Sequence, residues 1–192
     1  MQFIESEYTD TLEIKKSKFI TYITSYDKFD CLMKRLKEEH PKARHFVYAY
    51  RFLNNFDQIV ENSSDDGEPK GTSGKPTLSV LSGSSLINTA VIVVRYFGGT
   101  RLGTGGLVKA YSDAVNLVLK SSILKDYVKL EYKKLFIEYS QLSQIEYLIS
   151  NVDVKIIDKI FSEKICLKLE ASREEYDKLS SELFRDNILE DL

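Results

Sequence analysis

Most of the side chains that could do chemistry lie near two glycine-rich segments, residues 67–74 and 98–106. Asp65 and Asp66 precede the first segment, and Glu68 lies inside it. Grouped carboxylates can hold Mg²⁺ or act as acid and base. Acidic residues ahead of a Gly/Pro turn also commonly hydrogen-bond their own backbone, and no histidine lies in the segment. We therefore favour a structural role for this acidic loop over catalysis.

The second segment follows an apolar stretch and precedes a helical pattern. A strand, a glycine loop and a helix in this order present backbone N–H groups to an anion, and Arg95, Arg101 and Lys109 would add positive charge. The nucleotide-binding patterns GxxxxGK[ST] and GxGxxG are both absent from the segment. The alternative is that the glycines serve only a tight connection and close helix packing. We favour binding of a ligand or partner over packing alone. The expected binding residues are His45, Arg51, Lys75, Arg95, Gly98, Gly99, Arg101, Gly103, Gly105, Gly106 and Lys109.

Apolar periodicity predicts the elements that position these residues. In the first part of the chain they are two short strands within 11–25, a helix at 27–39 ended by Pro41, a strand at 44–52, a polar loop at 54–74, a helix at 75–86, a strand at 89–97 and a helix at 105–120. The strand at 89–97 is β-branched and nearly all apolar. We therefore expect it to be central in its sheet or covered on both faces.

The predicted strand at 44–52 alternates strictly between two faces. One face carries an aromatic row, made of Phe46, Tyr48, Tyr50 and Phe52. Such a row, flanked by Arg44 and Arg51, could stack nucleic-acid bases, but an aromatic row on a strand is more often core. If it is core, the opposite face shows His45 and Arg51, and Arg95 of the later strand would lie beside them. These side chains would then form a small cationic surface suited to phosphate or carboxylate.

A boundary between two domains is expected at residues 121–126, where glycine stops and the charge balance changes. We place the domains at 1–122 and 123–192. The second part predicts a strand at 127–138, a helix at 142–150, strands at 152–161 and 164–170, and a helix at 173–184. This βαββα order is that of a ferredoxin-like α/β sandwich, and the acidic tail at 187–192 provides no clear last strand.

The composition is that of a globular protein, with 43% hydrophobic and 29% charged residues. The N-terminus is acidic and lacks a signal-peptide apolar region, and no apolar run approaches the roughly 20 residues that span a bilayer, so we expect a cytoplasmic protein with no membrane contact. Cys31 and Cys166 are too isolated for a CxxC site and are expected to be buried reduced thiols, and neither a metal nor a cofactor is expected. Residues 67–109 contain one anion, Glu68, and five cations. The cations are Lys70, Lys75, Arg95, Arg101 and Lys109.

Seven ordered motifs in the first part resemble the YigZ/IMPACT family. They are residues 16–20 (KSKFI), 43–45 (ARH), 49–51 (AYR), 65–69 (DDGEP), 71–76 (GTSGKP), 95–99 (RYFGG) and 102–112 (LGTGGLVKAYS). The resemblance covers about residues 17–119, and the second part resembles the small second domain of bacterial members of the family.

This resemblance implies an α+β protein. The first domain would be a βα sandwich of the ribosomal-protein-S5-domain-2 type, and the second a ferredoxin-like sandwich similar to the last domain of elongation factor G. It also implies a role around translation: eukaryotic relatives restrain the kinase that senses amino-acid starvation by competing for its ribosome-associated activator, and bacterial members are suspected of binding nucleic acid or the ribosome. No catalytic activity comes with the resemblance.

Three hypotheses for the function follow. The first is a binding and regulatory protein that contacts RNA, the ribosome or a translation factor through the cationic glycine-rich surface. The second is an enzyme for a phosphorylated or carboxylated small molecule, with the acidic loop and His45 around the same cleft. The third is a pure protein-interaction module. The sequence leaves the oligomeric state open.

Overall fold

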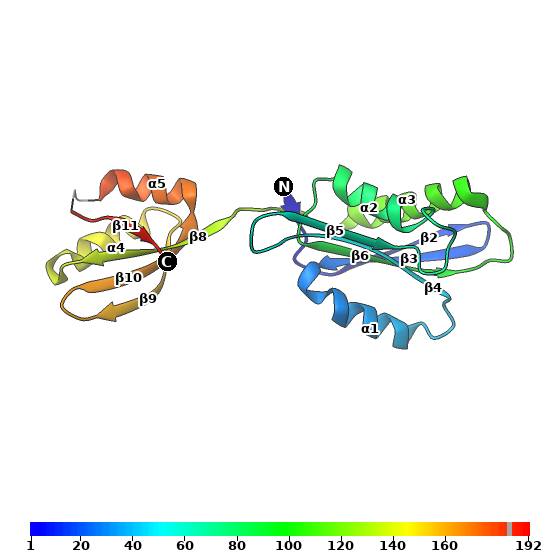
Figure 1. Cartoon of the computed structure of the whole chain (residues 1–192), viewed down its shortest axis with the longest axis horizontal. Coiled ribbons are helices and arrows are strands. Elements are labelled where there is room, and N and C mark those ends of the chain that lie inside the picture. The colour runs from blue at the N-terminus through cyan, green and yellow to red at the C-terminus, as the bar shows by residue number, and fades with distance from the viewer. Residues whose placement is uncertain (184–185) are drawn as a thin grey trace. The chain divides into compact units, whose positions relative to one another are not determined.

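The computed structural model describes residues 1–183 and 186–192 (Figure 1). The contacts divide the chain into two compact units, Met1–Tyr127 and Val128–Leu192. The first unit includes β7 (Lys125–Asp126), a two-residue strand that pairs antiparallel with β1 (Gln2–Phe3). Both units combine helices with antiparallel sheets, so the predicted α+β class is confirmed.

The first unit is built on a five-stranded antiparallel sheet of order β2-β3-β6-β4-β5. The strands are β2 (Tyr8–Ile14), β3 (Ser17–Ser25), β4 (His45–Leu53), β5 (Ile59–Ser64) and β6 (Thr89–Tyr96). Strand β6 is central, and seven of its eight residues are buried, because β-branched apolar side chains face a helix layer on each side. The sequence-based prediction for this strand is therefore confirmed.

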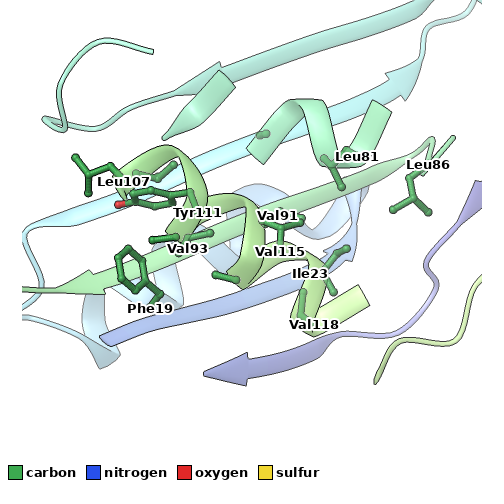
Figure 2. Packing of buried hydrophobic residues seen from close by; sticks show 14 of the residues in the cluster. Phe19, Ile23, Leu81, Leu86, Val91, Val93, Leu107, Tyr111, Val115 and Val118 are labelled. Atoms are coloured by element: carbon green, nitrogen blue, oxygen red, sulfur yellow. The ribbon is translucent and has the colours of Figure 1, made fainter. Parts of the chain in front are cut away.

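Helices cover both faces of this sheet (Figure 1). On one face lie α2 (Gly74–Gly83) and α3 (Gly103–Ser121), and on the other lies α1 (Phe29–Glu39), preceded by a 3₁₀ turn at Tyr26–Lys28. Figure 2 shows the larger core, in which Tyr111 of α3 and Phe19 of β3 point toward one another, with ring centroids 5.2 Å apart. The smaller core lies under α1.

The faces of β4 follow the predicted alternation. Val47 and Ala49 belong to the core under α2 and α3, whereas Phe46 and Tyr48 belong to the packing against α1. Tyr48 contacts Phe29 at 5.2 Å between ring centroids. The aromatic row therefore packs within the protein, as the core interpretation expects.

Several boundaries in the first unit differ from the sequence predictions, and three of these differences lie near the glycine segments. The expected loop at 54–74 contains strand β5, whose polar residues hid it because an edge strand has only one neighbour and little burial. Helix α2 ends at Gly83, before the buried Leu86. Helix α3 begins at Gly103, two residues before the predicted start, so Gly103 joins Gly105 and Gly106 in its first turn.

The second unit has the order βαββαβ. Its elements are β8 (Leu130–Ile137), α4 (Leu142–Ser150), β9 (Lys155–Phe161), β10 (Ile165–Ser172), α5 (Arg173–Glu182) and β11 (Leu189–Asp191), with a 3₁₀ turn at Tyr139–Gln141. The antiparallel sheet has the order β11-β8-β10-β9, and both helices contribute to one apolar core, which is the ferredoxin-like arrangement. The tail supplies the last strand that the sequence did not show, because Leu189 packs on this core and pairs with Leu135. The predicted end of α5 at residue 184 lies outside the described residues.

Candidate binding site

The central feature of the first unit is the end of β6, where Arg95 lies opposite His45 of β4 in the antiparallel register. Both residues occupy the face that α2 and α3 cover, because they share the alternation of Val47 and Val93 in the larger core. The expected juxtaposition of His45 and Arg95 is therefore present. After Tyr96 the chain leaves the sheet through Phe97 and enters the second glycine segment.

Gly98 is required by a close backbone approach. A Cβ atom at this position would lie 2.0 Å from the carbonyl carbon of Lys16, in the tight turn between β2 and β3. The Gly98 N–H donates a hydrogen bond to Oγ of Ser17 at 3.1 Å. This contact fixes the start of the glycine segment against the turn, at the beginning of the connection from β6 to α3.

Arg95 is a buried, paired cation. Its side chain is 6% exposed, and Nη1 donates to Oε1 of Glu68, whose side chain is 4% exposed. The hydroxyl of Tyr111 donates to the same Oε1 at 2.9 Å, and the ring of Tyr111 lies beside Leu107 in Figure 2. Burial raises the pKa of Tyr111, and the adjacent carboxylate raises it further, so the phenol stays a hydrogen-bond donor. The sequence analysis expected Arg95 to be part of a cationic surface. This expectation is wrong, because Arg95 is buried and its charge is neutralised by Glu68.

Asp65 organises the first glycine segment. Its Oδ1 accepts hydrogen bonds from the N–H groups of Ser73 (3.0 Å) and Gly74 (2.8 Å) and from the hydroxyl of Ser73 (2.7 Å). Its Oδ2 accepts from the Gly71 N–H at 2.7 Å. Burial acts to raise the pKa of Asp65, but the four hydrogen bonds together outweigh it, and the pKa is lowered. The charged carboxylate thus holds the chain as it enters α2.

Asp66 and His45 tie the same loop to β4. Oδ2 of Asp66 accepts from the Phe46 N–H at 2.6 Å, and the carbonyl oxygen of Asp66 accepts from Nδ1 of His45 at 2.8 Å. A carbonyl only accepts, so this contact assigns the proton to Nδ1 of His45. Together with Asp65 and Glu68, these contacts give all three acidic residues a part in holding the loop.

Two hollows, each of about 360 Å³, adjoin the buried Arg95. The basic hollow lies on the β4 side and is lined by Lys42, Arg44, His45, Arg95, Tyr96 and Phe97. The helix hollow lies at the start of α3 and is lined by Glu68, Pro69, Arg95, Phe97, Arg101, Leu102, Gly103, Thr104 and Leu107. Phe97 takes part in both, is 54% exposed, and has the Arg95 guanidinium carbon 5.7 Å from its ring centroid.

The start of α3 is open to the surroundings. Gly103 has a φ of +73°, which favours glycine, and a Cβ there or at Gly105 would meet no atom within 4 Å. The residue before the helix, Leu102, supplies no side-chain hydrogen bond to the helix end. The first N–H groups of a helix have no partners within the helix. The glycines therefore leave these donors accessible at the helix hollow.

Several expected site residues lie elsewhere. Arg51 is six residues along β4 from His45, about 20 Å away. There it is buried, pairs with Glu61 at 2.6 Å, and donates to the carbonyl of Leu86 at 2.7 Å. Lys109 is 77% exposed and pairs with Asp113 on the outside of α3, outside the lining of either hollow. Arg51 and Lys109 were expected at the site, and the structure does not bring them there.

The remaining candidates belong to the two glycine segments and the helices that follow them. Lys75 is exposed in the first turn of α2, and Gly99 has a φ of +86° in the connection to α3. Gly106 packs its Cα side near Leu102, since an added Cβ would lie 3.1 Å from the leucine Cβ. Neither Lys75 nor Gly99 lines a hollow.

The sequence analysis did not identify Phe97 or Lys42 as site residues, and it considered Arg44 only as a residue that flanks the aromatic row. The sequence did contain a feature that could have predicted an exposed ring at Phe97. It is an aromatic residue at the end of a buried strand and directly before two glycines. No such feature marks Lys42, because it lies in the connection before β4, and only the fold determines the direction of that connection.

A larger hollow of about 830 Å³ lies at the other end of β4. It is lined in part by Tyr26 and Phe52, whose rings stack at 4.1 Å, and by the 81% exposed Phe56. This hollow contains none of the expected binding residues. The smaller hollows concentrate the basic side chains and the helix start, so the candidate site is placed there.

In the part of the chain that the structure describes, no group of three or more His, Cys, Asp or Glu residues is arranged to hold a metal ion. Among the same residues, no helix has the length and apolarity needed to cross a membrane. Both cysteines are free thiols: Cys166 is buried, but Cys31 is exposed, contrary to the expectation for it.

The fold and site together define a two-domain α+β protein that positions a paired arginine and a glycine-rich helix start at one end of a sheet. Residues 15–119 match the family model of the Impact N-terminal domain. The chain belongs to the IMPACT family, and the resemblance found in the sequence is confirmed.

Bacterial relatives extend the similarity to most of the chain. It is 41% identical over 176 residues to an IMPACT family member of Haemophilus influenzae, covering 89% of this chain and 84% of the relative. It is also 41% identical over 160 residues to the IMPACT family member YigZ of Escherichia coli, covering 82% and 78%. A crystal structure described as that of a hypothetical protein is 34% identical, with a TM-score of 0.70, and covers 100% of this chain and 96% of that one.

Proposed function

We propose that this protein is a regulatory binding protein that contacts RNA, with ribosomal RNA the first candidate, through the surface around Phe97. We call the exposed ring of Phe97 together with Lys42, Arg44 and Arg101 the Phe97 surface. The observation that carries the proposal is this ring, 54% exposed between two hollows that hold basic side chains.

An exposed aromatic ring beside cations is the combination that binds single-stranded nucleic acid. Bases stack on the ring whatever their sequence, and the cations contact the phosphates. The Arg95 guanidinium also lies against the ring of Phe97. It contacts the ring, and the ring remains 54% exposed. A ring needed only for packing would be expected in the core.

The cations of the Phe97 surface are available for phosphate. Lys42, Arg44 and Arg101 are exposed, and within the described residues none of them takes part in an ion pair or hydrogen bond. Lys109, in contrast, already pairs with Asp113. The overall net charge of −2 opposes indiscriminate binding of nucleic acid, so the contact is local.

The enzyme hypothesis receives less support from the same geometry. Asp65 accepts four hydrogen bonds, Asp66 bonds the β4 backbone, and Glu68 bonds Arg95 and Tyr111. An acid or base for catalysis must reach a substrate proton, and each of these carboxylates is already engaged by the protein, Asp65 within the loop, Asp66 on β4, and Glu68 on Arg95 and Tyr111. The IMPACT relationship adds the expectation of a role around translation, which is why the ribosome is the first partner to test.

The test is binding of a fluorescent single-stranded RNA, measured by anisotropy, together with co-sedimentation with ribosomes. Replacing Phe97 with alanine should weaken RNA binding about fivefold or more, since stacking contributes about 1–3 kcal/mol per base. The matched control is Phe56→Ala, because Phe56 is the more exposed ring and lies at the other end of the sheet. It should bind as the wild type does.

Salt dependence provides an independent readout. Arg44→Ala or Arg101→Ala should each lower the slope of log affinity against log salt by about one phosphate contact. RNA binding that is unchanged by Phe97→Ala, or that does not vary with salt, would refute the proposal. Partners captured from lysate after nuclease treatment would instead support the protein-interaction hypothesis.

A further inference from the structure

We propose that the helix hollow binds a terminal phosphate, a phosphomonoester at the end of a nucleotide, with Arg95 and the start of α3 as its ligands. This inference rests on the proposed function for its setting and assigns the chemical group that the site takes. The hollow measures about 360 Å³ and contains Arg95, Arg101 and the first helical residues, Gly103 and Thr104. That space accommodates a phosphate with its attached sugar.

The first observation is an unused edge of the Arg95 guanidinium. Glu68 bonds only Nη1, and Nε is buried without any hydrogen-bond partner among the described residues. Nε and Nη2 form one edge of the planar group, and this edge binds two oxygens of a phosphate or carboxylate side by side. A buried donor without a partner is rare in folded proteins and calls for a missing acceptor.

The second observation is the helix start that meets the same hollow. Helix α3 is 19 residues long and has no side-chain cap, so its first N–H groups need acceptors. A helix of this length carries a partial positive charge at its N-terminus, which favours phosphate. Gly103 and Gly105 leave open space where a Cβ would stand, so an oxygen can approach the backbone closely. Arg101, exposed at the rim, adds a full positive charge.

Among the residues that line the hollow, Glu68 is the one anion, and its contacts show that it positions Arg95. It orients Arg95 by binding Nη1, with Tyr111 holding the same oxygen of the carboxylate. Because Glu68 cancels the charge of Arg95, attraction of the ligand depends on Arg101 and the helix start. A dianionic group benefits from these more than a monoanionic one. A terminal phosphate carries about −1.5 to −2 charges, whereas an internal phosphodiester carries one.

The burial of Arg95 also favours a phosphate at the end of a nucleic-acid strand over one inside it. Arg95 lines the hollow and is only 6% exposed, so a phosphate with nucleotides on both sides would have to thread the strand past it to reach the guanidinium. A terminal phosphate enters with one substituent. Phe97 at the rim then lies where the first base can stack.

The same chemistry comes from two sources, the end of an RNA strand or a free mononucleotide. The experiment compares one RNA sequence with a 5′-phosphate, a 3′-phosphate or hydroxyls at both ends, and tests adenosine monophosphate as a competitor. All binding is measured by anisotropy on the full chain, with the dye internal to the RNA. We expect one phosphorylated end to improve affinity about tenfold or more, the effect of one charge-assisted hydrogen bond.

Variants locate the effect. Arg101→Ala should abolish most of the preference for the phosphorylated end, and so should Arg95→Lys, which keeps the charge and removes the two-pronged edge. Arg101 is exposed, so its variant remains informative even if Arg95→Lys fails to fold. The control Lys120→Ala removes a charge from the far end of the same helix, about 26 Å from Gly103 at 1.5 Å per residue, and should keep the preference.

The outcomes separate this inference from the proposed function. Equal affinity for all three RNAs, with no competition by the mononucleotide, overturns the terminal-phosphate site, and RNA binding that still depends on Phe97 then leaves the proposed function intact. Binding of the mononucleotide that depends on Arg101, without binding of any RNA, supports the site with a free nucleotide as the ligand and overturns the RNA function.

Discussion

Replacing Asp65 with asparagine tests whether the acidic loop is a structural device that needs a charged carboxylate. Asparagine has the same size and shape but carries one oxygen and one NH₂ group. Three of the four hydrogen bonds to Asp65 reach Oδ1, from Ser73 and Gly74, and the fourth reaches Oδ2 from the Gly71 N–H. With its oxygen in place of Oδ1, the asparagine directs its NH₂ at the Gly71 N–H, and two donors face each other.

The expected destabilisation of the first unit is about 2–3 kcal/mol. Hydrogen bonds to a charged group contribute about 1.5–3 kcal/mol each and neutral ones about 1 kcal/mol. The variant loses one such bond and weakens three. The relief of burying a charge offsets part of this loss, because burial of Asp65 opposes its ionisation. Asp65→Ala, which loses all four bonds, should cost more.

The effect depends on pH in a defined direction. The pKa of Asp65 is lowered in the folded protein, so its charge stabilises the fold fully above the unfolded pKa of about 4. That contribution disappears as the pH falls through the lowered folded value. Wild type and Asp65→Asn should therefore differ most at pH 7, and the difference should shrink as the pH falls below about 4 toward the lowered pKa of the folded state.

The assay must report on the first unit alone, since the two units need not unfold together. Hydrogen exchange of the slowest amides in β6 gives the opening free energy of that unit. The control Asp113→Asn breaks an exposed pair with Lys109 and should cost less than about 1 kcal/mol. A loss below 1 kcal/mol for Asp65→Asn at pH 7, or a difference that persists unchanged to pH 3, would show that the carboxylate does not hold the loop as argued.

Three further outcomes follow from the geometry. Gly98→Ala should strongly lower the melting temperature of the first unit, measured by calorimetry, because its Cβ would lie 2.0 Å from the carbonyl carbon of Lys16. Gly105→Ala should raise the same melting temperature slightly, since an alanine Cβ has open space at this position and alanine is the better helix former by about 0.5–1 kcal/mol. Lys109→Ala should change RNA affinity less than twofold in the anisotropy assay, given its pair with Asp113 and its place outside both hollows. Arg51→Ala should destabilise by about 1–3 kcal/mol in denaturant unfolding, because the buried Leu86 carbonyl loses its donor while the exposed Glu61 is solvated, yet it should leave RNA binding of the folded protein unchanged.

The fold was predictable where burial shapes the local sequence. Strand β6 shows as a continuous apolar run because helices cover both its faces, and α4 was placed at its observed bounds because its apolar residues recur at helical spacing. Strands β5 and β11 were missed because each lies at the edge of its sheet and pairs on one side only. An edge strand can be polar and short, so its sequence resembles a loop.

The candidate site was predictable only in part, since its key contacts join residues far apart in the chain. The sequence showed which residue types gather near the glycines, but the pairing of Arg95 with Glu68 spans 27 positions, and no local pattern encodes it. The same pairing changes what the site can do. A free Arg95 would attract any anion, whereas an Arg95 held by Glu68 presents one edge in one direction. Attraction then falls to Arg101 and the start of α3, and Arg95 supplies geometry more than charge. We therefore expect the proposed phosphate site to discriminate among anions by shape more than by general electrostatic attraction.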